Sequence, residues 1–179
     1  MAGDARVRME VVPTDRMPPD LSRRLVAFCE RAFEEDLEPY FRAYAIDAHA
    51  VVRENGTILA HALWGLRWLA PGAREPLRTA YVEMVAVAAE HRGRGLGTLL
   101  MRTVADAIRS YELGALSPVA PGLYERLGWE RWLGPLAIRT PGGLRPTPDD
   151  RVMVLRLPGT PPLDPRAPLT AEWRAGELW

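Results

Sequence analysis

Three glycines alternate with other residues at Gly93, Gly95 and Gly97, a pattern that could hold a phosphate group. The apolar segment 81–88 before them predicts a strand that is buried on both faces. The segment 96–111 after them repeats apolar residues at three- and four-residue steps, which predicts a helix. The first N–H groups of a helix lack internal partners, and the peptide dipoles place roughly half a positive charge there. Because glycine lets the backbone approach an anion closely, this junction predicts a pyrophosphate site.

Two arginines, Arg92 and Arg94, add full positive charges to the junction. Taken alone, the glycines would favour a solvated turn, but the strand and the periodic helix around them favour a phosphate site. A Walker loop requires a lysine, and all 23 basic residues of this chain are arginine. A dinucleotide fingerprint requires G-x-G-x-x-G and an acidic residue about 20 residues further on. The spacing here is G-x-G-x-G, and the corresponding region holds Ser117 and Val119, so neither nucleotide class fits.

The pattern Arg92-x-x-Gly95-x-Gly97 resembles the pyrophosphate loop of the GNAT superfamily of acetyl-CoA-dependent N-acetyltransferases. This resemblance implies an α+β fold, with a central mixed β-sheet flanked by helices, and acetyl-CoA as the cofactor. It also implies that main-chain groups of the preceding strand hold the acetyl and pantetheine parts of the cofactor. The implied cofactor-binding residues are Met84, Val85, Val87, Arg92, Gly93, Arg94, Gly95, Leu96, Gly97 and Thr98.

The composition is that of an ordinary globular protein, with 47% hydrophobic and 26% charged residues and a formal net charge of zero. The length fits one domain, 1–179, and the balanced charge offers no basic field for nucleic acid. We expect a cytoplasmic protein, because there is no signal-peptide pattern and no apolar run of the ~18 residues that a membrane span needs. The single cysteine, Cys29, lies on a helical stripe and is expected in the core. The three histidines are scattered without ligand spacing, so no metal is expected.

The rest of the chain predicts a sequence of strands and helices. An Asn55-Gly56 turn predicts a β-hairpin of strands 49–54 and 57–69. Further strands are expected at 7–12, 114–116, 136–139 and 152–157, and helices at 20–33 (capped by Asp20), 40–46 and 120–127. This order is similar to that of the GNAT fold, and the resemblance covers roughly residues 6–157.

The C-terminal third carries the most specific resemblance. Its motifs are Leu113-Gly-Ala-Leu-Ser117, Leu123-Tyr-Glu-Arg-Leu-Gly-Trp129, Gly134-Pro135, Arg145-Pro-Thr-Pro-Asp-Asp150 and Trp173-Arg-Ala-Gly-Glu-Leu-Trp179. They resemble the aminoglycoside 2′-N-acetyltransferases, which end in a similar W-R-x-G-D/E-x-W. The resemblance implies that the tail, 158–179, folds back and that its last carboxylate lines the pocket for a polycationic drug.

A pocket for several ammonium groups should be ringed with carboxylates. Position and resemblance together give the expected substrate-binding residues as Asp36, Glu83, Ser117, Asp150, Glu177 and Trp179. Without a binding role, the acidic run at Asp36 would be a solvated face, Asp150 would be part of a loop turn, and the tail would be a frayed terminus. Two tryptophans close to the end of the chain argue against a free tail, because an exposed indole is costly.

Two residues, Glu83 and Tyr124, are expected to be catalytic. Glu83 interrupts an apolar strand, where an unpaired carboxylate costs several kcal/mol. From sequence, a salt bridge to an arginine explains Glu83 about as well as catalysis does. The resemblance implies that Glu83 deprotonates the incoming ammonium through water, and that Tyr124 gives a proton to the departing CoA thiolate. Without the resemblance, Tyr124 would fit an ordinary core position.

Three departures from the family pattern fall on the acceptor side. Phe41 stands where the family has a second aspartate, Met84 where well-known members have glycine, and Glu177 where aspartate is usual. They leave acetyl transfer intact and leave the aminoglycoside open, with an unusual one such as kasugamycin among the candidates.

The resulting prediction is transfer of acetyl to the 2′-amine of an aminoglycoside, with antibiotic resistance as the cellular role. The alternatives are another acceptor (a polyamine, a metabolite amine or a protein N-terminus) and a non-catalytic acyl-CoA sensor. A sensor needs neither Glu83 nor Tyr124. A homodimer is implied by the resemblance alone.

Overall fold

The computed structural model describes residues 7–179, which form two compact units. The first unit holds the described chain up to Gly65 together with residues 82–107, and the second holds residues 66–81 and 108–179. Two long strands, β3 (Thr57–Pro71) and β4 (Leu77–Val87), contribute a part to each unit.

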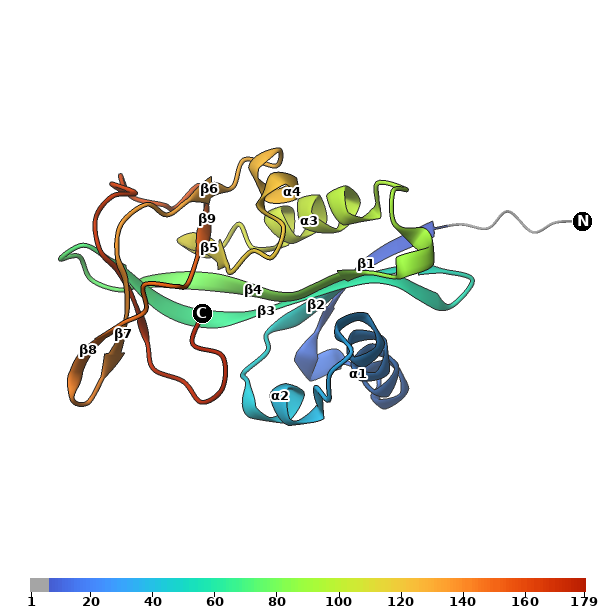
Figure 1. Ribbon diagram of the computed structural model, residues 1–179. Coiled ribbons are helices and arrows are strands. Elements are labelled where there is room, and N and C mark those ends of the chain that lie inside the picture. The colour runs from blue at the N-terminus through green and yellow to red at the C-terminus, as the bar shows by residue number, and fades with distance from the viewer. Residues whose placement is uncertain (1–6) are drawn as a thin grey trace, which may run out of the picture. The chain divides into compact units, whose positions relative to one another are not determined.

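The first unit is a sheet with helices on both faces (Figure 1). Apart from β3 and β4, its elements are β1 (Val7–Pro13), α1 (Pro19–Phe33), α2 (Glu38–Ala43), β2 (Ala48–Glu54) and α3 (Leu96–Ala107), with 3-10 turns at Thr14–Arg16 and Ala89–His91. β2 pairs antiparallel with both β1 and β3. Helices α1 and α2 lie on one face of these strands and α3 on the other (Figure 1). The apolar stripe of α1 is buried against the strands, and α3 buries Leu96, Leu100, Met101 and Val104, whereas α2 has no fully buried residue.

Most local predictions for this unit are confirmed, with three corrections. The helix predicted for 40–46 spans Glu38–Ala43 instead. The backbone at Asn55 and Gly56 has φ of 49° and 82°, as the predicted two-residue hairpin turn requires. Asp20 does not cap α1: Pro18 is the cap residue and Pro19 opens the helix, where its fixed φ is already helical. The helix predicted for 96–111 ends at Ala107 and continues only as a turn.

The second unit is built mainly from strands. Apart from β3 and β4, its elements are β5 (Leu113–Leu116), α4 (Pro121–Glu125), β6 (Glu130–Arg131), β7 (Leu136–Thr140), β8 (Gly143–Pro146), β9 (Met153–Arg156) and β10 (Leu169–Glu172). The strands follow the order β6-β9-β5-β4-β3-β10-β7-β8. The β4–β5 and β10–β7 pairs are parallel, whereas β3–β10, β5–β9, β6–β9 and β7–β8 are antiparallel, so the sheet is mixed as predicted.

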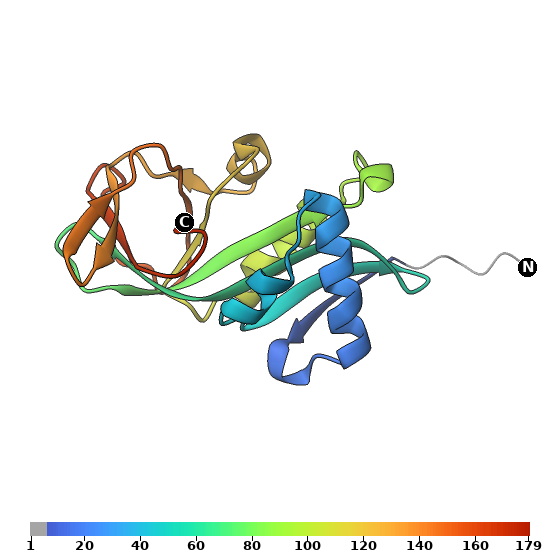
Figure 2. The same cartoon turned by 60° about the horizontal axis from the view of Figure 1, so that its bottom comes forward.

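The tail is more regular than the sequence indicated. Its strand β10 lies between β3 and β7, and was not predicted because it has four residues between proline-rich segments. Figure 2 shows the C-terminus inside the curve of this unit's strands. Trp179 is 5% exposed and belongs to the core cluster that includes Leu69, Tyr81 and Ile138.

Gly134 is expected to tolerate no side chain, because a Cβ there would collide with the carbonyl groups of Arg166 and Ala167 and lie 2.6 Å from the Ala167 carbonyl carbon. That segment cannot move away easily, because the Ala167 carbonyl also accepts a hydrogen bond from the indole N–H of Trp132 at 2.8 Å. Gly134→Ala should lower the free energy of unfolding by about 1–3 kcal/mol in urea denaturation. The matched control is Gly142→Ala, whose Cβ would meet only Thr140 Oγ1 at 3.7 Å. Equal stability of the two variants would contradict the prediction.

Candidate active site

The junction of β4 and α3 has the geometry of an anion cradle. Gly93 and Gly95 have φ of 79° and 77°, which only glycine adopts without strain, and a Cβ at either would meet nothing within 4 Å. The Leu99 N–H donates to the Gly95 carbonyl at 3.0 Å. The N–H groups that come before it in the first helical turn have no acceptor within the helix. An open loop that leads to a helix start suits the diphosphate of CoA.

The two arginines of the junction are exposed and anchored by their neighbours. Arg92 Nε donates to the Val87 carbonyl at 3.4 Å. Arg94 pairs with Glu54 at 3.3 Å, and its guanidinium also lies 2.8 Å from Nδ1 of His91. Arg94 is therefore partly neutralised, whereas Arg92 contributes charge without an ion pair among the described residues.

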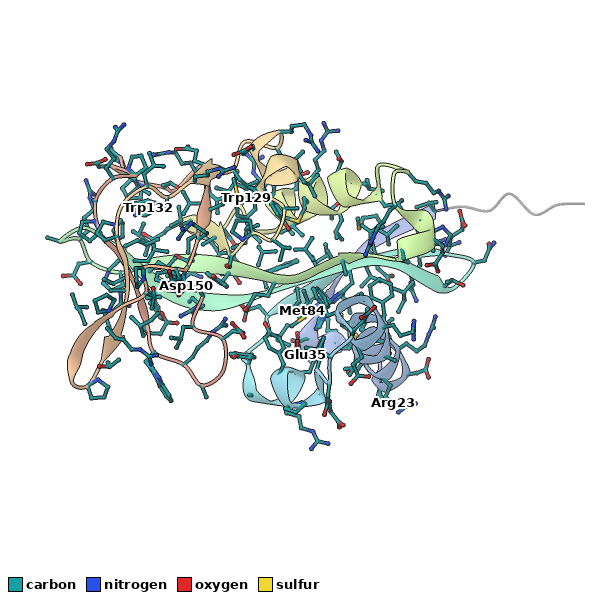
Figure 3. All side chains as sticks on the ribbon, in the orientation of Figure 1. Arg23, Glu35, Met84, Trp129, Trp132 and Asp150 are labelled. Atoms are coloured by element: carbon teal, nitrogen blue, oxygen red, sulfur yellow. The ribbon has the colours of Figure 1, made fainter. Side chains whose placement is uncertain are left out.

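The strand β4 changes its backbone conformation next to Glu83. Glu83, Met84 and Val85 are half-buried, whereas the residues just before them are buried. Met84 has φ of 52°, which is uncommon for a residue with a side chain. Its side chain packs on the apolar cluster of α1, on the α1 side of the strand (Figure 3). A glycine at this position would adopt the same backbone without strain.

A chain of three buried side chains lies beneath this strand. Cys29 Sγ is 3.2 Å from Nδ1 of His61, and Nε2 of His61 is 2.9 Å from Nδ1 of His49. The expectation that the histidines are scattered is wrong for this pair: β2–β3 pairing sets Val51 opposite His61, which leaves His49 and His61 diagonal on one face. The expectation that Cys29 is a core residue is confirmed, since it is fully buried.

Burial keeps all three groups neutral. It raises the pKa of Cys29 to about 12 and lowers the pKa of His49 to about 4. Burial, together with the neighbouring His49, lowers the pKa of His61 to about 3. Among residues 7–179, no group of three His, Cys, Asp or Glu residues is arranged to hold a metal ion.

The acceptor-side residues fall in both units. Asp36 is exposed in the first unit, where its carboxylate accepts the Glu38 N–H at 3.2 Å at the start of α2. Ser117 and Glu177 are exposed in the second unit. Trp179 is buried there, and its indole N–H donates to Thr147 Oγ1 at 2.8 Å.

A cavity of about 650 Å³ lies within the second unit. Asp150 lines this cavity together with Trp132 (both labelled in Figure 3) and with a set of prolines that includes Pro118, next to Ser117. Asp150 is therefore at a concave surface, as a ligand contact requires, whereas Trp179 does not line the cavity and is joined to it by its hydrogen bond to Thr147, a lining residue.

Tyr124 lies in α4, 8% exposed, with its ring edge-on to Trp129 at 6.2 Å between centroids. Burial raises the pKa of Tyr124 above its ordinary value, so the phenol holds its proton at neutral pH. This geometry serves a core tyrosine and a proton donor equally well.

Sequence reasoning missed Arg67, which is 3% exposed on β3. Its guanidinium donates to Glu172 Oε1 at 3.3 Å, to the Glu172 carbonyl at 2.9 Å and to the Leu178 carbonyl at 2.8 Å, and it lies 4.8 Å from the ring centre of Tyr81. The available signal was a single charge within an apolar strand, the same signal that identified Glu83.

Comparison with known proteins places the chain in a family. Residues 16–132 match the family model described as an acetyltransferase (GNAT) domain. In structure, the chain is similar to a GNAT-family N-acetyltransferase (YhbS) of Escherichia coli in complex with CoA, with a TM-score of 0.64, 20% identity and coverage of 97% of this chain and 93% of that one. It is also similar to a GNAT-family acetyltransferase of Brucella melitensis in complex with acetyl-CoA, with a TM-score of 0.61, 17% identity and coverage of 94% and 97%.

The chain therefore belongs to the GNAT family of acetyltransferases, which confirms the predicted fold and, with it, acetyl-CoA as the cofactor. The finer resemblance is confirmed by sequence: the chain is 37% identical over 166 residues to an aminoglycoside 2′-N-acetyltransferase of Mycolicibacterium fortuitum, covering 88% of this chain and 83% of that protein. Among residues 7–179, no helix is both long and apolar enough to cross a bilayer.

The buried histidines predict a dependence of stability on pH. In the folded protein the pKa values of His49 and His61 lie near 4 and 3. Below about pH 6.5 these histidines therefore bind protons in the unfolded chain but not in the folded one. This contribution to stability is complete above that pH and is lost as the pH falls towards 4. Urea denaturation should show the free energy of unfolding falling by up to about 1.4 kcal/mol per pH unit for each histidine.

The matched comparison is His49→Leu, which removes one site of proton uptake and should give a shallower slope between pH 7 and 5. Equal slopes for this variant and the wild type would contradict the assignment of the buried pair.

Proposed function

We propose that this acetyltransferase transfers the acetyl group of acetyl-CoA to the 2′-amine of an aminoglycoside, and that its cellular role is antibiotic resistance. The observation that carries the proposal is the 37% identity to an aminoglycoside 2′-N-acetyltransferase over 88% of the chain. Acetylation converts an ammonium to a neutral amide and so removes a cation that the drug needs for binding RNA. A homodimer and a cytoplasmic location remain predictions that accompany this function.

The cofactor segment supports the proposal through its local geometry. The open glycine loop and the start of α3 would hold the diphosphate of acetyl-CoA, with Arg92 and Arg94 beside it. Gly93, Leu96, Gly97 and Thr98 complete this set, and main-chain groups of Met84, Val85 and Val87 would hold the acetyl and pantetheine parts. When bound, acetyl-CoA supplies the acetyl group as a thioester.

Glu83 is the proposed general base. It is half-buried in β4, where a carboxylate can be reached by water and still be held by its surroundings. In the proposed reaction Glu83 takes a proton from the 2′-ammonium through a water molecule. The freed amine forms the new C–N bond as the C–S bond of the thioester breaks.

Tyr124 is the proposed general acid. Its buried phenol keeps its proton at neutral pH and would give it to the departing sulfur, so that CoA leaves as a thiol. The protons balance when the nitrogen loses two: one passes through water to Glu83 and is released to solvent, and the second leaves as the amide forms and replaces the proton that Tyr124 gave to the sulfur.

The acceptor side is proposed to recognise the remaining ammonium groups. Asp36, Ser117, Asp150 and Glu177 offer oxygen acceptors, and the terminal residue Trp179 adds a carboxylate. The cavity beside Asp150 supports this role, because it provides the concave surface that a sugar ring needs.

A pair of drugs tests the position of transfer. Tobramycin carries a 2′-amine and kanamycin A a 2′-hydroxyl, so thiol release from acetyl-CoA is expected with tobramycin and not with kanamycin A. Equal activity on both would move the reaction to another amine. No activity on any aminoglycoside, with acetyl-CoA still bound, would favour another amine acceptor or an acyl-CoA sensor.

Glu83→Gln tests the base. Because the amide cannot accept the proton, the rate should fall by on the order of 10²-fold or more, while acetyl-CoA affinity stays near that of the wild type. The matched control is Glu90→Gln, an exposed glutamate close by in the same segment, which should keep wild-type turnover. Turnover of Glu83→Gln within a few-fold of the control would remove Glu83 from the mechanism.

A further inference from the structure

Thr147 lines the cavity beside Asp150, and its residue is only 9% exposed. We propose that Thr147 is a specificity-determining residue for the acceptor: its hydroxyl, oriented by the indole N–H of Trp179, donates a hydrogen bond to a neutral oxygen of the bound sugar. This inference rests on the proposed function and deepens it, because it names a contact that selects an amino sugar among polycationic acceptors.

The backbone of Thr147 is held on the cavity wall. Its N–H donates to the carbonyl of Leu136, the first residue of β7, at 2.9 Å. Pro146 precedes Thr147 and Pro148 follows it, and a residue before proline is largely confined to extended backbone. The Thr147 side chain therefore leaves the wall from a fixed point.

The hydroxyl of Thr147 has one partner and one proton to spare. The Trp179 indole N–H lies 2.8 Å from Oγ1, and because an indole nitrogen can only donate, the oxygen accepts. A hydroxyl also carries one proton to donate, and no hydrogen bond from the Thr147 hydroxyl is formed to any of residues 7–179. Because Thr147 borders the cavity, that proton is available to a ligand there.

Trp179 is a rigid partner for this hydroxyl. It is 5% exposed and belongs to the core cluster that also includes Trp132 and Leu136, both of which line the cavity. The indole N–H therefore stays in place and restricts the rotation of the Thr147 hydroxyl. A hydrogen bond accepted by an oxygen also polarises its own O–H group, so the bond from Trp179 makes Thr147 a better donor.

The same turn carries a carboxylate next to this donor. The Asp150 N–H donates to the Thr147 carbonyl at 3.3 Å, and both residues line the cavity. A carboxylate binds an ammonium group and a hydroxyl proton binds an oxygen, so the turn is complementary to an amino alcohol. Aminoglycoside rings carry amino groups beside oxygen atoms, whereas a linear polyamine has ammonium groups and no oxygen.

Two arginines of the cavity lining are engaged by other groups. Arg131 Nε pairs with Glu125 at 2.6 Å, and one nitrogen of Arg151 donates to two backbone carbonyls at 3.0 and 2.7 Å. Both arginines are exposed, so solvent screens their charges. The buried hydroxyl of Thr147 is the donor that a ligand can contact away from bulk water.

Thr147→Val tests the contact, because it removes the hydroxyl and nearly keeps the shape of the side chain. Calorimetric titration with tobramycin, in the presence of CoA so that no transfer occurs, should show a roughly 3- to 10-fold loss of affinity, as expected for one hydrogen bond. Thr147→Ser keeps the hydroxyl and should restore the affinity to within about 2-fold of the wild type. Equal affinities of the Val and Ser variants would overturn the proposal.

Trp179→Phe separates a ligand contact from simple support of the tail. This variant breaks the hydrogen bond between Trp179 and Thr147 but leaves the hydroxyl, whereas Thr147→Val removes both. If Thr147 acted only by holding Trp179, adding Thr147→Val to Trp179→Phe would cost no further affinity. We expect a further loss of roughly 2- to 10-fold in that background, with little change in the KM for acetyl-CoA. No further loss would overturn the proposal.

The two measurements, affinity and transfer, let the inference and the proposed function fail separately. If tobramycin is acetylated but Thr147→Val costs nothing in the Trp179→Phe background, only the inference is overturned. If Thr147→Val weakens the binding of an aminoglycoside that is not acetylated at its 2′-amine, only the proposed function is overturned. A wild-type enzyme that binds no aminoglycoside would overturn both.

Discussion

The buried guanidinium of Arg67 is the constraint on which the second unit depends. Removing such a cation from water costs several kcal/mol unless partners surround it. Three of its hydrogen bonds go to Glu172 and Leu178, and the face of Tyr81 covers it. Because Glu172 and Leu178 both belong to the segment that begins with β10, the charge is satisfied only when that segment is in place. The segment is therefore fixed by an electrostatic requirement as well as by apolar burial.

This requirement also links two parts of the acceptor side. Arg67 fixes Leu178, and the next residue, Trp179, donates to Thr147. Thr147 accepts in turn the N–H of Asp150 through its carbonyl, at 3.3 Å, in the turn that carries Asp150 to the cavity. A continuous series of contacts thus runs from a buried cation to a predicted drug-binding carboxylate. Proline-rich segments gain order from such contacts rather than from their own backbone pairing.

What the sequence predicted well was local: the glycine junction before α3, the Asn55-Gly56 hairpin and the family itself, all read from residues close together in the chain. What it missed depends on pairing between distant residues. Strand β10 exists because β3 and β7 flank it, and His49 meets His61 because the hairpin register sets them diagonally. The burial of Arg67 with a partner could have been predicted, because a lone charge in an apolar strand indicates a buried partner.

The first unit combines an adaptable segment with a rigid one. Gly93 and Gly95 adopt left-handed backbone in open space, so their loop can adjust to a diphosphate, and ordering it costs entropy that weakens binding. Met84 adopts a similar backbone in a packed setting, where its side chain lies against the apolar cluster of α1. Changes in the glycine loop should therefore act first on cofactor affinity, whereas changes around Met84 should act first on the rate of transfer. The same left-handed backbone region is thus left open in the glycine loop and packed at Met84, as the proposed roles in binding and in catalysis require.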